Sequence, residues 1–90
     1  MLNEMKYVYE VYKEKSFSKA AKKLFISQPA LSNMVRKAEK EMGAPIFDRS
    51  TIPLTVTKEG AYYIRTVEKI LFLERKSGTV FQIMTGLRAA

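Results

Sequence analysis

Two helix-start signals lie nine residues apart within residues 18–37, and they constrain the fold more than any other feature of the chain. Ser18 can cap an alanine-rich helix over about residues 19–25, because a serine hydroxyl at that position accepts a backbone N–H. Ser27 can cap a second helix, and Pro29 then falls in its first turn, where a missing N–H costs nothing. Two short helices joined by about three residues predict a helix-turn-helix over about residues 18–37.

Helical periodicity is also present before this pair and in its second member. From residue 2 to residue 14, apolar side chains recur every three or four positions, which predicts one amphipathic helix. Its apolar stripe contains Leu2, Met5, Val8, Val11 and Tyr12, and its polar face contains Asn3, Glu4, Lys6, Glu10 and Lys13. The second helix of the pair is expected to run to about Met42, because Gly43 suits the left-handed residue that ends many helices.

The pattern changes after this glycine. Residues 45–48 and 54–56 are short apolar-rich segments separated by turn-forming residues, which is typical of two strands joined by a tight connection. They predict a small β-hairpin over about residues 45–56, in the position of a wing. An irregular loop that covers the core is the alternative.

A last helix follows the wing. Thr57 is a suitable N-cap for a helix that begins at Lys58. The expected fold is therefore mainly α: a winged helix-turn-helix of three helices plus a two-stranded β wing, followed by a long linker and dimerisation helix. We place the winged domain at residues 1–58, and the linker helix and tail at residues 59–90.

The chain of 90 residues contains neither histidine nor cysteine. The commonest general base and metal ligand is therefore missing, and neither a disulfide nor a thiolate site can form. We expect no catalytic residues, no metal and no cofactor, which argues against an enzyme.

The net charge is +7, from 16 Lys and Arg against 9 Asp and Glu. Residues 1–14 sum to −1 (two basic, three acidic), residues 15–60 to +5 (nine and four), and residues 61–90 to +3 (five and two). A basic middle and tail suit a polyanion, either nucleic acid or an anionic membrane surface; lysines that only solubilise the surface are the alternative. No stretch approaches the roughly 20 apolar residues of a membrane span, and the N-terminus lacks a signal peptide's apolar run. We expect a soluble, cytoplasmic protein.

The last predicted helix carries more apolar surface than one small domain can cover. The run from residue 70 to residue 73 is apolar nearly all round, so that one face can pack on the domain while the other implies a partner chain. We expect a homodimer through this helix, with the dimerisation residues Val67, Ile70, Leu71, Phe72 and Leu73. Further along, Val80, Phe81, Ile83 and Met84 are expected to pack on the partner as well.

Several segments match, in order and in spacing, the N-terminal region of LysR-type transcriptional regulators of bacteria. They are SFSKAA at 16–21, LFISQPALS at 24–32, Glu39, Gly43, IFDR at 46–49 and LTVTKEG at 54–60. The resemblance covers about residues 2–75. It implies a winged helix-turn-helix, a linker helix, a homodimer and binding to double-stranded DNA.

The same resemblance carries three qualifications. Members of the family have a C-terminal effector-binding domain, which lies beyond this chain, so a small-molecule effector is expected only in a full-length form. The family usually has glycine where this chain has Lys15, and a lysine with positive φ there would cost about 1 kcal/mol relative to glycine, which favours a different end for the first helix. The wing lacks the family's second basic residue and carries Pro53 instead.

In a helix-turn-helix the second helix places its N-terminal residues in the major groove of DNA. Here Gln28 and Asn33 carry amides suited to adenine, whereas Pro29 and Ala30 suit a thymine methyl group. Arg36 could reach guanine or a phosphate. Serine hydroxyls and basic side chains are expected to contact phosphates, and these are Ser18, Ser32, Lys19, Lys37 and Arg49.

Sequence-specific binding to double-stranded DNA by a transcription regulator, at half-sites related by a two-fold axis, is therefore the leading hypothesis. A helical dimerisation or adaptor module with an incidental basic surface is the alternative, although it would present apolar anchors where residues 28–33 are polar. A membrane-surface helix over residues 62–76 is a third possibility. Its charges are mixed around the helix rather than gathered on one face, which argues against it.

Overall fold

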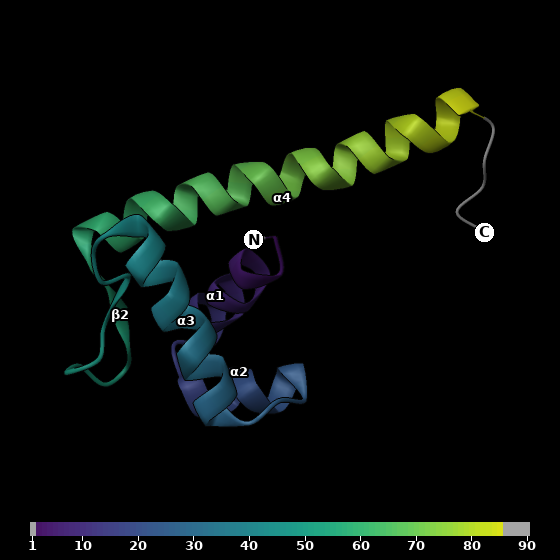
Figure 1. Ribbon diagram of the computed structural model, residues 1–90. Helices are drawn as coiled ribbons and strands as arrows, with labels where there is room; N and C mark the ends of the chain where they lie inside the picture. The colour runs from purple at the N-terminus through teal and green to yellow at the C-terminus, as the bar shows by residue number, and fades with distance from the viewer. Residues whose placement is uncertain (1, 86–90) are drawn as a thin grey trace.

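The computed structural model describes the backbone of residues 2–85 and the side chains of residues 3–72. Its elements follow the predicted order of three helices, a hairpin and a long helix (Figure 1). They are α1 (Leu2–Glu14), α2 (Phe17–Leu24), α3 (Gln28–Met42), β1 (Phe47–Asp48), β2 (Thr55–Val56) and α4 (Lys58–Thr85). The prediction of a mainly helical winged helix-turn-helix is confirmed.

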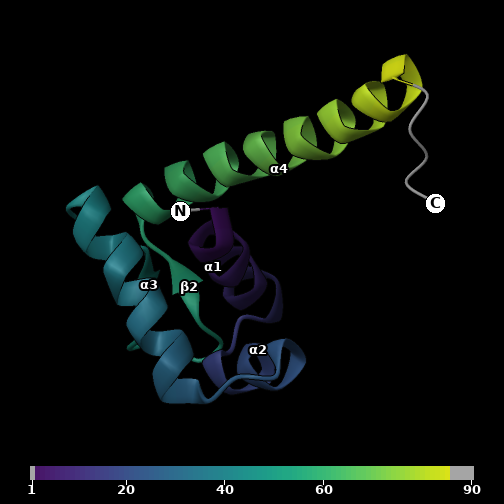
Figure 2. The same cartoon turned by 45° about the vertical axis from the view of Figure 1, so that its right-hand side comes forward.

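The first three helices and the wing enclose one hydrophobic core. Figure 2 shows α2 crossing below α1 and α3, while α4 crosses above them. The adjacent alanines of α2 allow close approach of the helices, since both are buried and neither carries bulk beyond a methyl group. The core consists of Val8, Val11, Ala20, Ala21, Leu31, Val35, Ala38, Ile46, Phe47 and Ile64.

Glu4 was expected on the polar face of α1, and that prediction is wrong. Only 6% of its surface is exposed, and its Oε2 atom lies 3.1 Å from Nζ of Lys37 in α3. The periodicity of α1 cannot show this, because α3 is brought against that side of α1 only in the folded chain.

The start of α2 also differs from the prediction. Ser16, not Ser18, is the N-cap: its backbone is extended and its hydroxyl accepts the N–H of Lys19 at 3.2 Å. The earlier start brings Phe17 into the helix, where its ring meets that of Phe47 edge to face at 5.9 Å. Phe25, which was expected inside the helix, is instead its left-handed C-cap with φ 58°.

The second helix of the pair forms as predicted. The Ser27 hydroxyl accepts the N–H of Ala30 at 3.1 Å, and Pro29 lies in the first turn. At the other end Gly43 adopts φ 86° and donates its N–H to the carbonyl of Glu39 at 2.8 Å. Both boundaries of α3 are thus set by local sequence signals.

The turn after α1 is left-handed even though a lysine occupies it. Lys15 has φ 54°, and α1 ends directly before it, so the different helix end that the lysine favoured is not found. Such a conformation costs a non-glycine residue about 1 kcal/mol. Two contacts offset this cost: the N–H of Leu54 donates to the Lys15 carbonyl at 3.3 Å, and the ammonium lies 5.0 Å from the ring centre of Tyr12.

Each of the first three helices is followed by a left-handed residue, which lets the chain turn so that the next helix can cross. These residues are Lys15 after α1, Phe25 after α2 and Gly43 after α3. Only glycine accepts this conformation without a steric cost. The left-handed turn at Phe25 leads directly into the capped start of α3.

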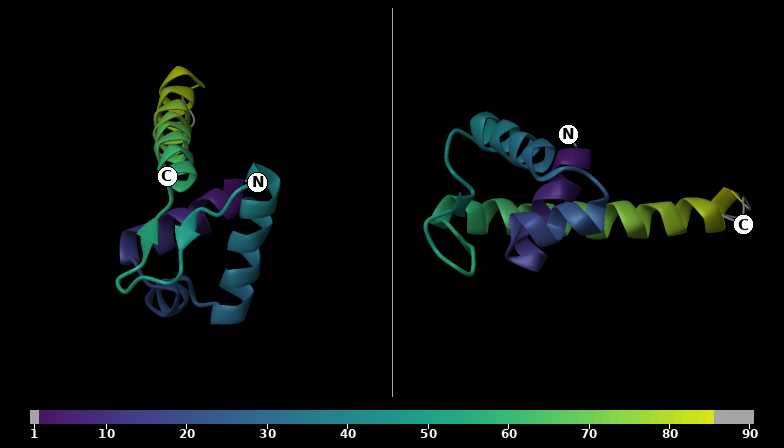
Figure 3. Two further views of the ribbon diagram at one scale, coloured as in Figure 1. Left: turned by 90° about the vertical axis from the view of Figure 1, so that its left-hand side faces the viewer. Right: turned by 90° about the horizontal axis from the view of Figure 1, so that it is seen from below.

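The predicted hairpin is present but short. β1 and β2 are antiparallel, with Phe47 opposite Val56 and Asp48 opposite Thr55. Each strand contains only two residues, and Leu54, the residue before β2, donates its N–H to the Lys15 carbonyl at the end of α1. The right panel of Figure 3 shows the connecting loop projecting away from the helices.

The start of α4 is fixed against the wing. The Thr57 hydroxyl caps the helix as predicted, accepting the N–H of Gly60 at 2.8 Å, and it also donates to the carbonyl of Pro45. Farther along, Ile64 and Val67 are buried by their own chain. Within the described residues, none of the helices combines the length and the apolar character needed to span a membrane.

Gly60 approaches the backbone so closely that any side chain would collide with it. A Cβ atom at this position would lie 1.9 Å from the carbonyl oxygen of Ile46. We expect Gly60→Ala to lower the free energy of unfolding by about 3 kcal/mol, the upper end of the usual cost of overpacking, because backbone atoms must move. Urea denaturation followed by circular dichroism measures this change.

Gly43→Ala is the matched control. Its Cβ would meet no heavy atom within 4 Å, so only the left-handed backbone opposes the substitution, at about 1 kcal/mol. Equal losses for the two variants would show that close contact with Ile46 is not what requires glycine at position 60.

Candidate nucleic-acid interface

The N-terminal half of α3 presents a continuous exposed face. Gln28, Pro29, Ala30, Asn33 and Arg36 are all exposed. Pro29, Asn33 and Arg36 are four and three positions apart along one side of the helix, Ala30 lies three before Asn33, and Gln28 precedes them at the helix end. This end of α3 lies beside α2 and away from α4 (Figure 1). The predicted base-reading residues are therefore gathered on one accessible edge of the domain.

The chemistry of this face suits the edges of bases. The amides of Gln28 and Asn33 can each donate and accept a hydrogen bond, which matches the paired donor and acceptor of adenine. Pro29 and Ala30 offer small apolar surfaces between them. The backbone N–H groups of the first turn point out of the helix end, where they favour an anion such as phosphate.

Two of the predicted phosphate-contacting residues lie on the first turn of α2. Ser18 and Lys19 are both exposed. Since Ser16 performs the capping, the Ser18 hydroxyl does not hold the helix end, and its oxygen lies 3.2 Å from that of Ser16. The first turn of α2 thus offers a hydroxyl and an ammonium beside the start of α3.

Lys37 lies apart from the exposed face at the start of α3. Its hydrogen bond to Glu4, together with the charges of Glu4 and Glu41, raises the pKa of Lys37 above its ordinary value. The ammonium is therefore protonated at neutral pH, and the Glu4 carboxylate already compensates its charge. This residue ties α3 to the N-terminal end of α1.

Arg49 leads into the loop of the wing and is held from three sides. Its Nη1 donates to the Ser32 hydroxyl at 2.9 Å, its Nη2 lies 3.5 Å from a carboxylate oxygen of Glu39, and its guanidinium lies 4.4 Å from the ring centre of Phe17. About a third of the side chain, 33%, remains exposed. The structure therefore brings Arg49 and Ser32, two of the predicted contact residues, into direct contact.

Glu39 is a structural residue to which the sequence patterns assigned no role. Its Oε2 accepts the N–H groups of Ile46 at 2.8 Å and of Phe47 at 3.4 Å, while Oε1 faces Arg49. A single carboxylate on α3 thereby fixes the start of the wing. Glu39 is among the residues that carry the resemblance to LysR-type regulators, and that resemblance is its signal in the sequence.

The residues predicted to form a dimer differ in exposure. Val67 is 1% exposed within one chain, so its own domain already covers it. Ile70 and Leu71 are half-buried, whereas Phe72 is 57% exposed. The side chains of Leu73, Val80, Phe81, Ile83 and Met84 lie outside the described residues. Among the predicted dimerisation residues whose side chains are described, Ile70, Leu71 and Phe72 therefore leave apolar surface uncovered.

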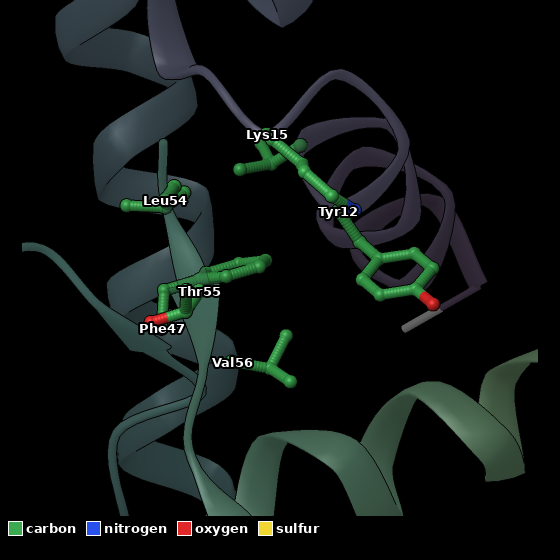
Figure 4. Close-up of a pocket in the computed structure, with 7 residues that line it drawn as sticks. Tyr12, Lys15, Phe47, Leu54, Thr55 and Val56 are labelled. Carbon is green, nitrogen blue, oxygen red and sulfur yellow. The ribbon is translucent and has the colours of Figure 1, made fainter. Parts of the chain in front are cut away.

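A hollow of about 240 Å³ lies behind the wing, between the C-terminal end of α1 and strand β2 (Figure 4). Its lining is mostly apolar and contains Val11, Tyr12, Lys15, Phe47, Leu54, Thr55 and Val56. Among the described residues, no group of three or more acidic side chains is arranged to hold a metal ion.

Comparison with known proteins identifies the family. The family described as "Bacterial regulatory helix-turn-helix protein, lysR family" matches residues 2–61. The chain belongs to the LysR family. The matched range includes α1, the helix-turn-helix, the wing and the first turn of α4, which are the elements that build the exposed face of α3.

Individual LysR proteins resemble this chain in sequence and in structure. It is 40% identical to the uncharacterized HTH-type transcriptional regulator YcgK of Bacillus subtilis (strain 168), over 94% of this chain and 29% of that protein. It is 37% identical to the HTH-type transcriptional regulator BenM of Acinetobacter baylyi, over 78% of this chain and 23% of that protein. The chain thus spans less than a third of either relative.

Solved structures match over nearly the whole chain. The BenM DBD in its complex with benA site 1 DNA has a TM-score of 0.91 at 30% identity, covering 98% of this chain and 99% of that one. Full-length BenM, as its R156H mutant, has a TM-score of 0.85 at 32% identity, and this chain covers 28% of it.

Proposed function

We propose that this chain is the sequence-specific, double-stranded-DNA-binding module of a LysR-type transcription regulator. The observation that carries the proposal is the exposed polar face at the N-terminal end of α3, from Gln28 to Arg36. α3 is the second helix of a helix-turn-helix, and in this motif the N-terminal residues of the second helix enter the major groove. The likeness to a BenM DBD solved with DNA supports the same assignment. This function requires neither catalytic chemistry nor a cofactor.

We assign two roles to the surface. Gln28 and Asn33 read base edges through their amides, with Pro29 and Ala30 against thymine methyl groups. Phosphates are contacted by Ser18, Lys19, Ser32 and Arg36, with a weaker contribution from Lys37, whose charge the Glu4 carboxylate already compensates.

An adaptor module is the competing function. Its docking surface would need large apolar anchors. Over residues 3–72, whose side chains are described, the exposed large apolar side chains are Phe25, Ile52, Tyr62 and Phe72, and none of them belongs to α3. The polar face of α3 therefore favours nucleic acid over a protein partner.

We further propose that the functional unit is a homodimer formed through α4. The half-buried and exposed apolar side chains of Ile70, Leu71 and Phe72 supply the contact surface. A two-fold axis through α4 presents two α3 helices to two related half-sites on DNA. The dimer acts in the cytoplasm, and a small-molecule effector would bind a further domain of a full-length protein.

Binding to duplex DNA should weaken as salt rises, because each neutralised phosphate releases counterions. We expect log K to fall by about 0.9 per phosphate contact for each tenfold rise in salt concentration. Fluorescence anisotropy with a labelled duplex at several salt concentrations gives the slope. Lys19→Ala should reduce it by about one contact, whereas Lys69→Ala, at an exposed position of α4, should not. A wild-type protein that binds no duplex at low salt would refute the proposed function.

Base reading and phosphate contact should separate by mutation. Gln28→Ala should cost about 1–3 kcal/mol on the preferred site and flatten the sequence preference, because its bidentate contact is lost. Lys19→Ala should weaken all duplexes alike. Selection of bound sequences from a random DNA pool, repeated with each variant, measures both effects. Identical selection profiles for the two variants would contradict this division of roles.

Placing charge on the apolar surface of α4 should separate the dimer. Leu71→Glu with Phe72→Glu is expected to give a folded monomer, since the described part of the domain leaves both side chains at least partly uncovered. Binding to a two-half-site duplex should weaken strongly, because the second half-site is no longer linked. Sedimentation velocity measures the assembly. Lys69→Glu is the control, since it also places a new carboxylate on the same helix. An unchanged dimer in the double variant would place the interface elsewhere.

A further inference from the structure

We propose that Arg49 is a positioning residue, whose guanidinium holds the Ser32 hydroxyl so that this hydroxyl donates its hydrogen bond to DNA. The inference rests on the proposed function. It gives Arg49 a different role from direct neutralisation of a phosphate, which is what a basic residue at the edge of a wing would otherwise suggest.

The first step is the geometry of the guanidinium. It joins three elements, because it begins the wing loop, contacts α3 at Ser32 and Glu39, and lies over Phe17 of α2. The two α3 partners are seven residues apart, which is close to two helical turns, so they lie on the same side of that helix. A planar group held by a hydroxyl, a carboxylate and an aromatic face has little freedom to turn toward a phosphate.

The second step is the chemistry of Ser32. A serine oxygen can accept hydrogen bonds but has a single O–H to donate. Because Nη1 of Arg49 donates to that oxygen at 2.9 Å, the O–H must point away from the guanidinium. Ser32 lies four positions after Gln28 and four before Arg36, on the same side of α3. Its hydrogen is therefore available to an acceptor on DNA, either a phosphate oxygen or a base acceptor.

The third step concerns the support of the wing. The hairpin has only two pairs of residues; Phe47, Leu54 and Val56 pack on the core, and β2 also borders the hollow shown in Figure 4. In addition to this packing, the contacts of Arg49 and Glu39 join the wing directly to α3. Any movement of the wing would move the guanidinium, and with it the direction in which Ser32 donates.

Arg49→Lys separates positioning from charge neutralisation. Lysine keeps the positive charge, but one ammonium cannot at once donate to Ser32, pair with Glu39 and lie flat on Phe17. If Arg49 neutralises a phosphate, the lysine variant should bind nearly as well as the wild type. If it positions Ser32, the lysine variant should behave like Ser32→Ala.

The experiment is a double-mutant cycle on DNA affinity with the whole 90-residue chain. Arg49→Lys and Ser32→Ala are each expected to weaken binding to the preferred duplex about tenfold, the usual loss for one charge-assisted hydrogen bond. The double variant should bind about as weakly as the single variants, because both remove the same contact. The salt slope of Arg49→Lys should equal that of the wild type.

Three results would overturn the inference. The first is wild-type affinity for Arg49→Lys. The second is a double variant whose loss of affinity is the product of the two single losses. The third is a salt slope that falls by about 0.9 in Arg49→Ala and is restored in Arg49→Lys. Arg65→Lys, at an exposed position on α4, is the matched control and should bind as the wild type does.

Two measurements separate failure of this inference from unfolding of the variants and from failure of the proposed function. Urea denaturation of every variant without DNA identifies any loss that comes from unfolding, and the affinity comparison is made at a temperature where all variants are folded. If the wild type binds no duplex, the proposed function fails and the DNA role of Ser32 fails with it. If the wild type binds and the single losses multiply, only the positioning role of Arg49 fails.

Discussion

The carboxylate of Glu39 connects the two parts of the domain that must be held together for binding. It is the point at which α3 receives two backbone N–H groups of the wing and the guanidinium of Arg49. Short hairpins are marginal by themselves, and this one has only two residue pairs. In addition to the packing of Ile46 and Phe47 in the core, side-chain contacts therefore join the wing to α3, and they fix the exposed face of α3 relative to the wing.

Local signals predicted local structure well. Ser27, Pro29 and Gly43 fix both ends of α3 through contacts at the helix ends, so the sequence alone predicts where α3 begins and ends. The prediction that Ser18 caps α2 is wrong because Ser16 is an equally good cap two residues earlier, and the packing of Phe17 against Phe47 decides between the two serines. No local pattern distinguishes two serines whose roles depend on an aromatic ring 30 residues farther along the chain (47 − 17).

The same reasoning accounts for what could be predicted of the binding surface. Exposure of Asn33 follows from helical periodicity, because Leu31 and Val35 must face the core. Gln28 lies on the side of the helix that carries Leu31 and Val35, and it is exposed at the first position of α3. The partners of Arg49 could not be predicted in this way. Ser32 is 17 residues away from it, and nothing in either residue's neighbourhood indicates that they meet. The prediction that Glu4 is exposed is wrong for a similar reason, because its burial depends on Lys37 in another helix.

Pairing with carboxylates reduces the number of cationic side chains that the protein can offer to DNA, although it leaves the net charge of +7 unchanged. Among the described residues, cationic side chains that lie within 3.5 Å of a carboxylate include Lys13, Lys23, Lys37 and Arg49. Hydrogen bonds to glutamates raise the pKa of Lys23 and Lys37, so their charges persist but are compensated. The reading residues of α3, by contrast, are mostly neutral amides and small groups. Electrostatic attraction and base reading are therefore assigned to different side chains, which is why salt and sequence should affect binding independently.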